Sequence, residues 1–254
     1  MSPSRRLLLQ AVALLVLIVA GTAVLARVLD SRGPVPPAAD QTVQGPVLLV
    51  PGYGGATASL EVLAQALRAA GRTASVVPLP GDGTGELTAS AAVLDAAVAA
   101  TGAPAVDLVG YSAGGVVVRL WAQDDPDRAR RIITLGSPHH GTRLAALGAV
   151  FAPGACPLAC QQLAPGSPLL DALGEDDETP DGPQWLSLWT AQDETVTPPD
   201  SARLDGAVNV ELQDVCPALQ LSHGQLPLDP VVTRIVLDAL AAPEVLAPTP
   251  SVCG

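Results

Sequence analysis

Short aliphatic runs alternate with longer segments of helical periodicity along this chain. The runs are continuous, as in strands that are buried on both faces of a parallel sheet. The longer segments have the apolar spacing of helices that cross from one strand to the next. The runs span residues 47–50, 75–79, 106–109, 132–135, 185–189 and 208–212. The pattern predicts an α/β fold with a mainly parallel sheet of about six strands and flanking helices.

The intervening segments predict four helices. Each carries an N-cap type residue at its start, a glycine after its end or an apolar stripe. Gly71 and Gly102 follow the first two segments, as is typical of helix C-termini. The segments are 59–70, 88–100, 113–123 and 230–241.

One connection interrupts this alternation. About fifty residues separate the runs at 132–135 and 185–189, and loops of that length are uncommon unless they have a function of their own. The apolar part of the connection, 144–173, is either a pair of helices stapled by a local disulfide and packed on the sheet, or a cap over an active site. We expect a cap-like insertion.

The chain starts with a segment typical of export or membrane anchoring. An uncharged apolar run at 7–26 follows Arg5 and Arg6. At about 1.5 Å per helical residue, this run just spans a bilayer core of roughly 30 Å. Small residues at 21–23 favour a cleaved signal peptide, whereas the length favours an uncleaved anchor. The paired arginines leave both the twin-arginine and the general export routes open.

A linker is predicted between this segment and the folded domain. Residues 30–45 are polar and rich in proline, so they bury little apolar area and read as an extended connection. The predicted organisation is a signal peptide or anchor plus linker over 1–45, and one domain over 46–254. With 48% hydrophobic residues, the chain has enough apolar area for one substantial core.

The charge balance excludes a nucleic-acid partner. All 13 basic residues are arginine, against 25 acidic residues, so the net charge is −12. A surface of this sign repels a phosphate backbone. Aromatic residues make up only 2% of the chain, which leaves no platform for stacking bases.

Export changes how the four cysteines are interpreted, because thiols tend to pair outside the cytosol. Four cysteines allow three connectivities. Cys156 and Cys160 lie close together in sequence, and Cys216 and Cys253 flank the last predicted helix. We therefore favour Cys156 with Cys160 and Cys216 with Cys253. The histidines are remote from any CxxC pair, which argues against a metal site.

A serine lies between a predicted strand and a predicted helix in the segment Gly110-Tyr111-Ser112-Ala113-Gly114. This segment matches GxSxG, in which a sharp strand-to-helix turn exposes a nucleophilic serine. The alternative is a turn of small residues without chemistry. The strand before the motif and the helix after it favour Ser112 as a nucleophile.

A nucleophilic serine needs a base, and histidine is the natural one near neutral pH. The chain has three histidines, His139, His140 and His223. The order serine, acid, histidine expected of this architecture selects His223. We expect His139 and His140, which follow a predicted strand, to stabilise a turn or to line the pocket wall.

The histidine in turn needs a carboxylate, at a strand end between Ser112 and His223. Asp193 follows the run at 185–189 and fits best, with Glu194 and Asp200 as alternatives. The acidic residues at 176–178 precede that run and read as solvated surface.

Two backbone N–H groups are needed to stabilise a tetrahedral oxyanion. The amide of Ala113, at the start of a helix, is one candidate. The loop after the first strand supplies the other, because Gly52, Gly54 and Gly55 allow close approach of the backbone. Tyr53 N–H is the expected donor, the alternative being a glycine-rich turn with no such role.

These motifs resemble those of small bacterial α/β-hydrolase lipases and esterases, particularly the extracytoplasmic ones of high-GC bacteria. The resemblance covers about 46–241. It rests on VLLVPGYGG, VDLVGYSAGG, IITLGSPHHGT, and a tail from LWTAQDETV to LSHGQLPLDP. It implies an α/β-hydrolase fold with Ser112 as nucleophile, Asp193 as acid, His223 as base, and the Tyr53 and Ala113 amides as oxyanion hole. The chain departs from the family in having Pro51 where His is common, and in its long connection at 144–173.

The combined expectation is a serine hydrolase of carboxylic esters, either a lipase or a lipid esterase, that forms an acyl-enzyme and needs no cofactor. Its partners would be a lipid or small ester and, if the N-terminal segment is uncleaved, the membrane. We expect a monomer outside the cytoplasm, secreted or anchored. One alternative is an acyltransferase or thioesterase with the same triad. The other is a catalytically silent, membrane-tethered interaction domain, which the presence of every triad member disfavours.

Overall fold

The structure is a computed structural model that describes residues 5, 39–175 and 177–254. The predicted signal peptide or anchor at 7–26 and the first part of the predicted linker lie outside these residues. Within the part of the chain that the structure describes, no helix combines the length and apolar character needed to cross a membrane.

Six parallel strands form one sheet in the described residues, which confirms the predicted fold class. Their order across the sheet is β2-β1-β3-β4-β5-β6. The strands are β1 (Val47–Val50), β2 (Ala74–Val76), β3 (Val106–Tyr111), β4 (Ala129–Leu135), β5 (Gln184–Trp189) and β6 (Val208–Glu211). Because the strands run in one direction, the loops that follow them meet at one edge of the sheet.

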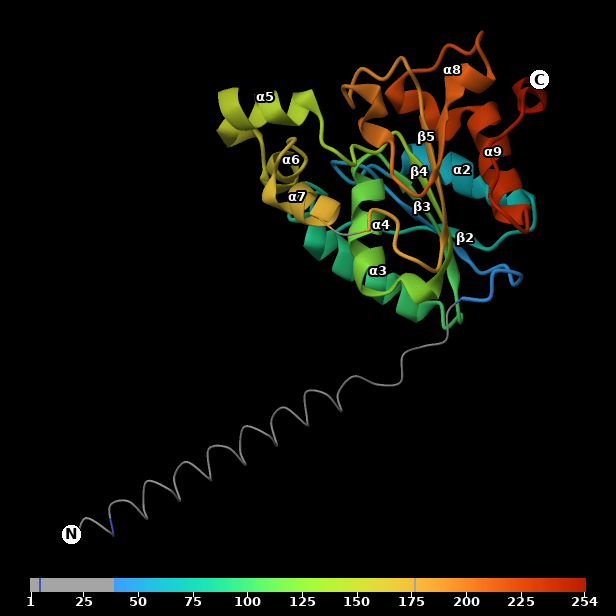
Figure 1. Ribbon diagram of the computed structural model, residues 1–254, viewed down its shortest axis with the longest axis horizontal. Coiled ribbons are helices and arrows are strands. Elements are labelled where there is room, and N and C mark those ends of the chain that lie inside the picture. The colour runs from blue at the N-terminus through green and yellow to red at the C-terminus, as the bar shows by residue number, and fades with distance from the viewer. Residues whose placement is uncertain (1–4, 6–38, 176) are drawn as a thin grey trace. The chain divides into compact units, whose positions relative to one another are not determined.

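Helices cover both faces of this sheet (Figure 1). On one face lie α2 (Ala58–Ala69) and α9 (Pro230–Ala241), and on the other lie α3 (Leu87–Ala100) and α4 (Ala113–Asp124). Both cores are largely aliphatic. Each fully buried leucine, isoleucine or valine contributes about 1.5–3 kcal/mol of transfer free energy, so the apolar runs of the sequence hold the layers together.

Five of the six strands differ from the predicted runs at one or both ends. β3 ends at Tyr111 rather than 109, and β5 starts at Gln184 rather than 185. β2 spans Ala74–Val76 rather than 75–79, and β6 ends at Glu211 because Leu212 begins the short helix α8 (Leu212–Val215). β4 starts at Ala129 rather than 132, and therefore includes Arg130 and Arg131. Both arginines are fully buried. A hydrophobic pattern does not identify such residues as part of a central strand, because arginine is rarely buried unless it is paired.

Arg130 is buried because it binds Asp107, a fully buried residue of the adjacent strand β3. Its Nε and Nη2 atoms donate to the two Asp107 carboxylate oxygens at 2.9 and 2.8 Å. Arg72 donates to the same carboxylate at 2.5 Å. Arg130 also donates to the Leu240 carbonyl near the end of α9, at 2.7 Å. This ionic cluster therefore joins two strands to the last helix.

The predicted insertion contains three helices and a short 3-10 turn rather than a pair of helices. These are α5 (Arg143–Phe151), η2 (Pro153–Ala155), α6 (Leu158–Gln162) and α7 (Pro168–Glu175). Figure 1 shows α5, α6 and α7 as a group beside α3 and α4. The N–H of Ala159 donates to the Thr84 carbonyl at 3.1 Å, and Gln162 accepts from the Leu87 N–H at 2.9 Å. The insertion is thus hydrogen-bonded to the segment that leads into α3.

Both expected disulfide pairings are present. Cys156 and Cys160 are joined within the insertion, between η2 and α6. Cys216 and Cys253 are joined across 37 residues, between the end of α8 and the 3-10 turn η5 (Pro250–Cys253). The second bond holds the C-terminal segment to the body of the domain. The remaining 3-10 turns are η1 (Pro126–Arg128), η3 (Pro199–Ala202) and η4 (His223–Leu228).

Removal of the Asp107 carboxylate should strongly destabilise the domain. In Asp107→Ala, two arginines lose their partner in a dry environment, and breaking a buried ion pair in this way costs roughly 3–5 kcal/mol. Urea unfolding followed by circular dichroism measures this loss. The matched control is Asp124→Ala, an exposed acid at the end of α4, which should change stability by no more than about 0.5 kcal/mol. Equal stability of the two variants would contradict this role of the cluster.

Candidate active site

Ser112 lies at the turn where β3 ends and α4 begins. Its backbone has φ 54° and ψ −127°, and within the described residues it is the only non-glycine with a positive φ. Such a conformation costs about 1–3 kcal/mol and is typical of functional sites. The Ser112 N–H donates to the Leu135 carbonyl at the end of β4, at 2.8 Å. The neighbouring strand thus helps to hold the strained turn.

Two glycines of the motif allow this turn to form. A Cβ atom at Gly114 would lie 2.2 Å from the Val50 carbonyl oxygen, and one at Gly110 would lie 2.5 Å from the Gly115 Cα atom. Both neighbours are backbone atoms, which cannot move aside cheaply. The close contacts account for the small residues on each side of Ser112.

The structure brings Ser112, His223 and Asp193 together from three separate parts of the chain. His223 opens η4, and Asp193 lies in the loop after β5. The Nε2 atom of His223 is 3.0 Å from the Ser112 Oγ atom, and its Nδ1 atom is 2.7 Å from the Asp193 Oδ2 atom. His223 and Asp193 are each only 5% exposed. With Nδ1 protonated, the imidazole donates to Asp193 and accepts from the serine hydroxyl.

The second carboxylate oxygen of Asp193 is held by its own loop. The Oδ1 atom accepts hydrogen bonds from the backbone N–H groups of Thr195, at 2.9 Å, and Val196, at 2.7 Å. Glu194, an alternative acid, instead accepts from the backbone N–H of His223 at 3.2 Å. Asp200, the other alternative, is an exposed residue of η3. The geometry therefore aims Asp193 at the imidazole.

The two candidate oxyanion donors belong to segments next to Ser112. Ala113 is the first residue of α4, where backbone N–H groups have no partner within the helix. The loop that carries Tyr53 passes very close to the serine, because a Cβ atom at Gly52 would lie 2.9 Å from the Ser112 Cβ atom. Tyr53 borders the pocket beside the serine.

Tyr111 contacts the imidazole of His223, a role that the sequence pattern did not reveal. The two ring centroids are 5.2 Å apart, and the Tyr111 hydroxyl donates to the His223 carbonyl oxygen at 3.3 Å. Burial raises the pKa of Tyr111 to about 12, with smaller contributions from the charges of Asp193 and Glu194. Tyr111 therefore stays protonated and able to donate. Its position next to Ser112 is the only signal for this contact in the sequence.

An apolar pocket of about 290 Å³ opens beside Ser112. Much of its wall comes from the insertion, through α5 and α6, and the rest comes from the turn at Ser112 and from the loops after β1, β4 and β5. The lining residues are Tyr53, Ser112, Pro138, Thr142, Leu144, Ala145, Gly148, Ala155, Cys160, Leu163, Thr195 and Val196. The insertion at 144–173 thus borders the candidate site, as a cap would.

Neither His139 nor His140 is among the residues that line this pocket; of the two expected roles, a turn or the pocket wall, their place in the turn at 139–140 fits the first. His139 is buried, and its Nε2 atom lies 3.2 Å from the Thr134 hydroxyl. Burial lowers the pKa of His139 well below its usual value, and Arg119 adds to the shift, so this histidine is neutral. His140 faces away and binds Glu178 at 2.8 Å. Both side chains are drawn away from the pocket by these partners.

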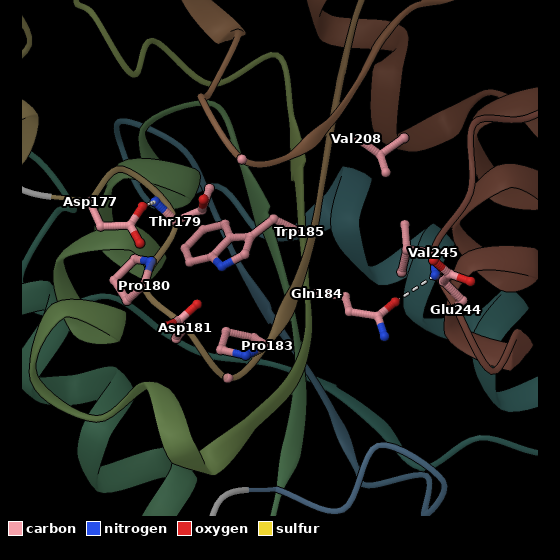
Figure 2. Close-up of a pocket in the computed structure, with 12 residues that line it drawn as sticks. Asp177, Thr179, Pro180, Asp181, Pro183, Gln184, Trp185, Val208, Glu244 and Val245 are labelled. Carbon is pink, nitrogen blue, oxygen red and sulfur yellow. Dashed lines mark hydrogen bonds between the residues drawn. The ribbon is translucent and has the colours of Figure 1, made fainter.

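A second, larger hollow of about 570 Å³ lies at the opposite end of β5. Figure 2 shows the Trp185 ring beside the loop with Asp181, and the Gln184 side chain reaching toward Val245. Gln184 and Trp185 begin β5, whereas Asp193 follows its other end. This polar hollow is therefore remote from Ser112 and lies outside the candidate active site.

The fold matches that of known enzymes. Residues 45–154 match a protein family described as alpha/beta hydrolase fold. A mature-form crystal structure of the Bacillus licheniformis lipase BlEst2 is 20% identical, with a TM-score of 0.64 over 83% of this chain and 96% of that one. The Paleococcus ferrophilus monoacylglycerol lipase is 18% identical, with a TM-score of 0.57 over 79% and 95%. A structure from work on the metagenome-derived lipolytic enzymes LipS and LipT is 17% identical, with a TM-score of 0.60 over 82% and 98%. The chain therefore has the α/β-hydrolase fold.

The raised pKa of Tyr111 predicts a loss of stability at high pH. An unfolded tyrosine loses its proton near pH 10, whereas Tyr111 in the folded protein keeps it until about pH 12. Between these values the unfolded chain binds fewer protons, so the free energy of unfolding falls as the pH rises. Lysine is absent from the chain and the cysteines are bonded, so tyrosine is the side chain whose ordinary pKa falls in this range.

Urea unfolding between pH 9 and pH 12 tests this expectation. Tyr111→Phe should weaken the decline in stability, because it removes the group whose proton is retained on folding. Tyr53→Phe is the control, since it leaves the contribution of Tyr111 in place. A decline of unchanged slope in Tyr111→Phe would contradict the raised pKa.

Proposed function

We propose that the protein is a serine hydrolase of carboxylic esters. The observation that carries the proposal is the pair of contacts that joins Ser112 to His223 at 3.0 Å and His223 to Asp193 at 2.7 Å, beside an apolar pocket. A histidine oriented by a carboxylate is the base that a serine nucleophile needs.

Acylation begins with attack of the Ser112 Oγ atom on the ester carbonyl carbon. His223 Nε2 accepts the serine proton, and Asp193 stabilises the imidazolium that forms. The carbonyl oxygen becomes an oxyanion, which accepts hydrogen bonds from the Tyr53 and Ala113 amides. Collapse of the intermediate breaks the bond to the alcohol oxygen, which takes the proton from His223. The alcohol leaves, and the acyl group stays on Ser112.

Deacylation repeats these steps with water. His223 takes a proton from water as the water oxygen attacks the acyl carbon, and the same two amides stabilise the second oxyanion. The bond to Ser112 Oγ then breaks, and His223 returns the proton to the serine. The products are a carboxylic acid and an alcohol, so the reaction needs no cofactor.

The pocket favours an ester with an apolar acyl chain. Its wall combines aliphatic residues with Cys160 of the Cys156–Cys160 disulfide, and charged side chains are absent from the described residues that line it. Several structures of similar fold are named lipases. We therefore propose a lipid or small-ester substrate and a lipase or lipid-esterase activity. The two disulfides agree with a location outside the cytoplasm, where the protein would act as a monomer.

Substitutions at the candidate triad should show that activity depends on Asp193 and not on the neighbouring Glu194. Ser112→Ala should abolish turnover of p-nitrophenyl butyrate. Asp193→Asn should lower kcat by about 10⁴-fold, because the imidazole loses its orientation and the stabilisation of its charged form. Glu194→Gln should keep most of the activity, since Glu194 contacts only the His223 backbone. Full activity in Ser112→Ala would rule out the proposed mechanism.

Acyl-chain length should depend on the α5 wall of the pocket. Ala145→Leu places added bulk in the pocket and should lower kcat/KM for an octanoate ester at least about tenfold, with little effect on an acetate ester. The matched control is Ala146→Leu on the same helix, because Ala146 is not among the lining residues. Kinetics with p-nitrophenyl esters of increasing chain length measure the effect. An equal loss for acetate and octanoate would argue against this pocket as the acyl site.

A further inference from the structure

The hydroxyl of Thr142 joins the insertion to the loop that carries Asp193. It donates to the Thr195 carbonyl at 2.7 Å and accepts from the Thr197 N–H at 3.1 Å. It also accepts from the Leu144 N–H at 3.4 Å, as the N-cap of α5. Thr142 is 6% exposed and borders the pocket. One buried hydroxyl is therefore shared by a cap helix and the acid loop.

Backbone hydrogen bonds reinforce the same junction. The N–H of Arg143 donates to the Thr197 carbonyl at 2.9 Å, and the N–H of Thr142 donates to the Leu163 carbonyl at 3.0 Å. Leu163 directly follows α6. The start of α5, the end of α6 and the acid loop thus meet at Thr142.

The junction continues to the Asp193 carboxylate. Thr195 uses its carbonyl to accept from Thr142 and its N–H to donate to Asp193 Oδ1 at 2.9 Å. The backbone of Thr195 therefore links the Thr142 hydroxyl directly to the Asp193 carboxylate. Val196 donates to the same carboxylate oxygen at 2.7 Å and also borders the pocket. A shift of this loop would turn the carboxylate relative to His223 and reshape the pocket wall.

We propose that Thr142 is a positioning residue for Asp193, through which the insertion sets the orientation of the catalytic acid. This inference rests on the proposed function. Loss of the hydroxyl leaves the Thr195 carbonyl and the N–H groups of Thr197 and Leu144 without this partner, and the loop must move to satisfy its two groups. Small displacements of this kind act on catalysis because proton transfer depends on orientation.

The test compares Thr142→Val, which keeps the shape of the side chain but removes the hydroxyl, with Thr142→Ser, which keeps the hydroxyl. We expect Thr142→Val to lower kcat for p-nitrophenyl acetate by about tenfold to a hundredfold. Here kcat is the rate divided by the concentration of active sites, which is determined by complete labelling with a fluorophosphonate. KM should change little, and Thr142→Ser should restore kcat to near the unmodified value. Thr142→Ala replaces the valine variant if valine prevents folding.

A double-mutant cycle with Asp193→Asn separates positioning from general stability. If Thr142 acts through Asp193, Thr142→Val should have almost no further effect on kcat once Asp193 is replaced. Thr179→Val is the matched control, because it removes a buried hydroxyl that donates to the Asp205 carbonyl, remote from Ser112; it should leave kcat unchanged.

Additive losses in the cycle, or an unchanged kcat in Thr142→Val and Thr142→Ala, would overturn the inference. If the unmodified protein hydrolyses no ester, the proposed function fails and the inference fails with it. If the unmodified protein is active but the Thr142 variants behave as Thr179→Val does, only the inference fails.

Discussion

Ser112 holds a left-handed backbone conformation that costs a non-glycine residue about 1–3 kcal/mol, and the surrounding sheet keeps it in place. Leu135 at the end of β4 accepts its N–H, and Gly114 packs against the Val50 carbonyl at the end of β1. The central strands thus fix the position of one hydroxyl at the carboxyl edge of the sheet. His223 and Asp193, the other members of the candidate triad, are arranged around this hydroxyl.

The partners of Ser112 are positioned by loops whose polar groups are paired locally. Asp193 is aimed by the Thr195 and Val196 amides, and His223 lies between that carboxylate and the Tyr111 ring. The insertion adds an apolar wall and is hydrogen-bonded to the acid loop through Thr142. Substrate binding and acid orientation therefore share one set of contacts. The fold alone is compatible with many functions, so the proposed ester hydrolysis rests on this arrangement of site residues.

Periodicity and motif order predict the features that are local in sequence. The six apolar runs identify the strands, and GxSxG with its flanking strand and helix marks the turn at Ser112. Contacts between distant residues are harder to predict. Arg130 is buried in β4 because Asp107 of β3 binds it, and Tyr111 donates to His223, which lies 112 positions further along the chain. His139 does not line the pocket, and its imidazole contacts the buried hydroxyl of Thr134 instead. Such pairings depend on the folded arrangement, which hydrophobic spacing does not encode.

Covalent labelling tests the central claim, that Ser112 is the nucleophile, most directly. The unmodified protein is reacted with a fluorophosphonate ester, digested with trypsin and sequenced by mass spectrometry. Because the chain has no lysine, Ser112 falls in a single peptide over residues 73–119. If Ser112 is the nucleophile, one phosphonyl group appears on Ser112 and none on the other serines of that peptide, and Ser112→Ala is not labelled. A label on another residue, or equal labelling of Ser112→Ala, would contradict this claim.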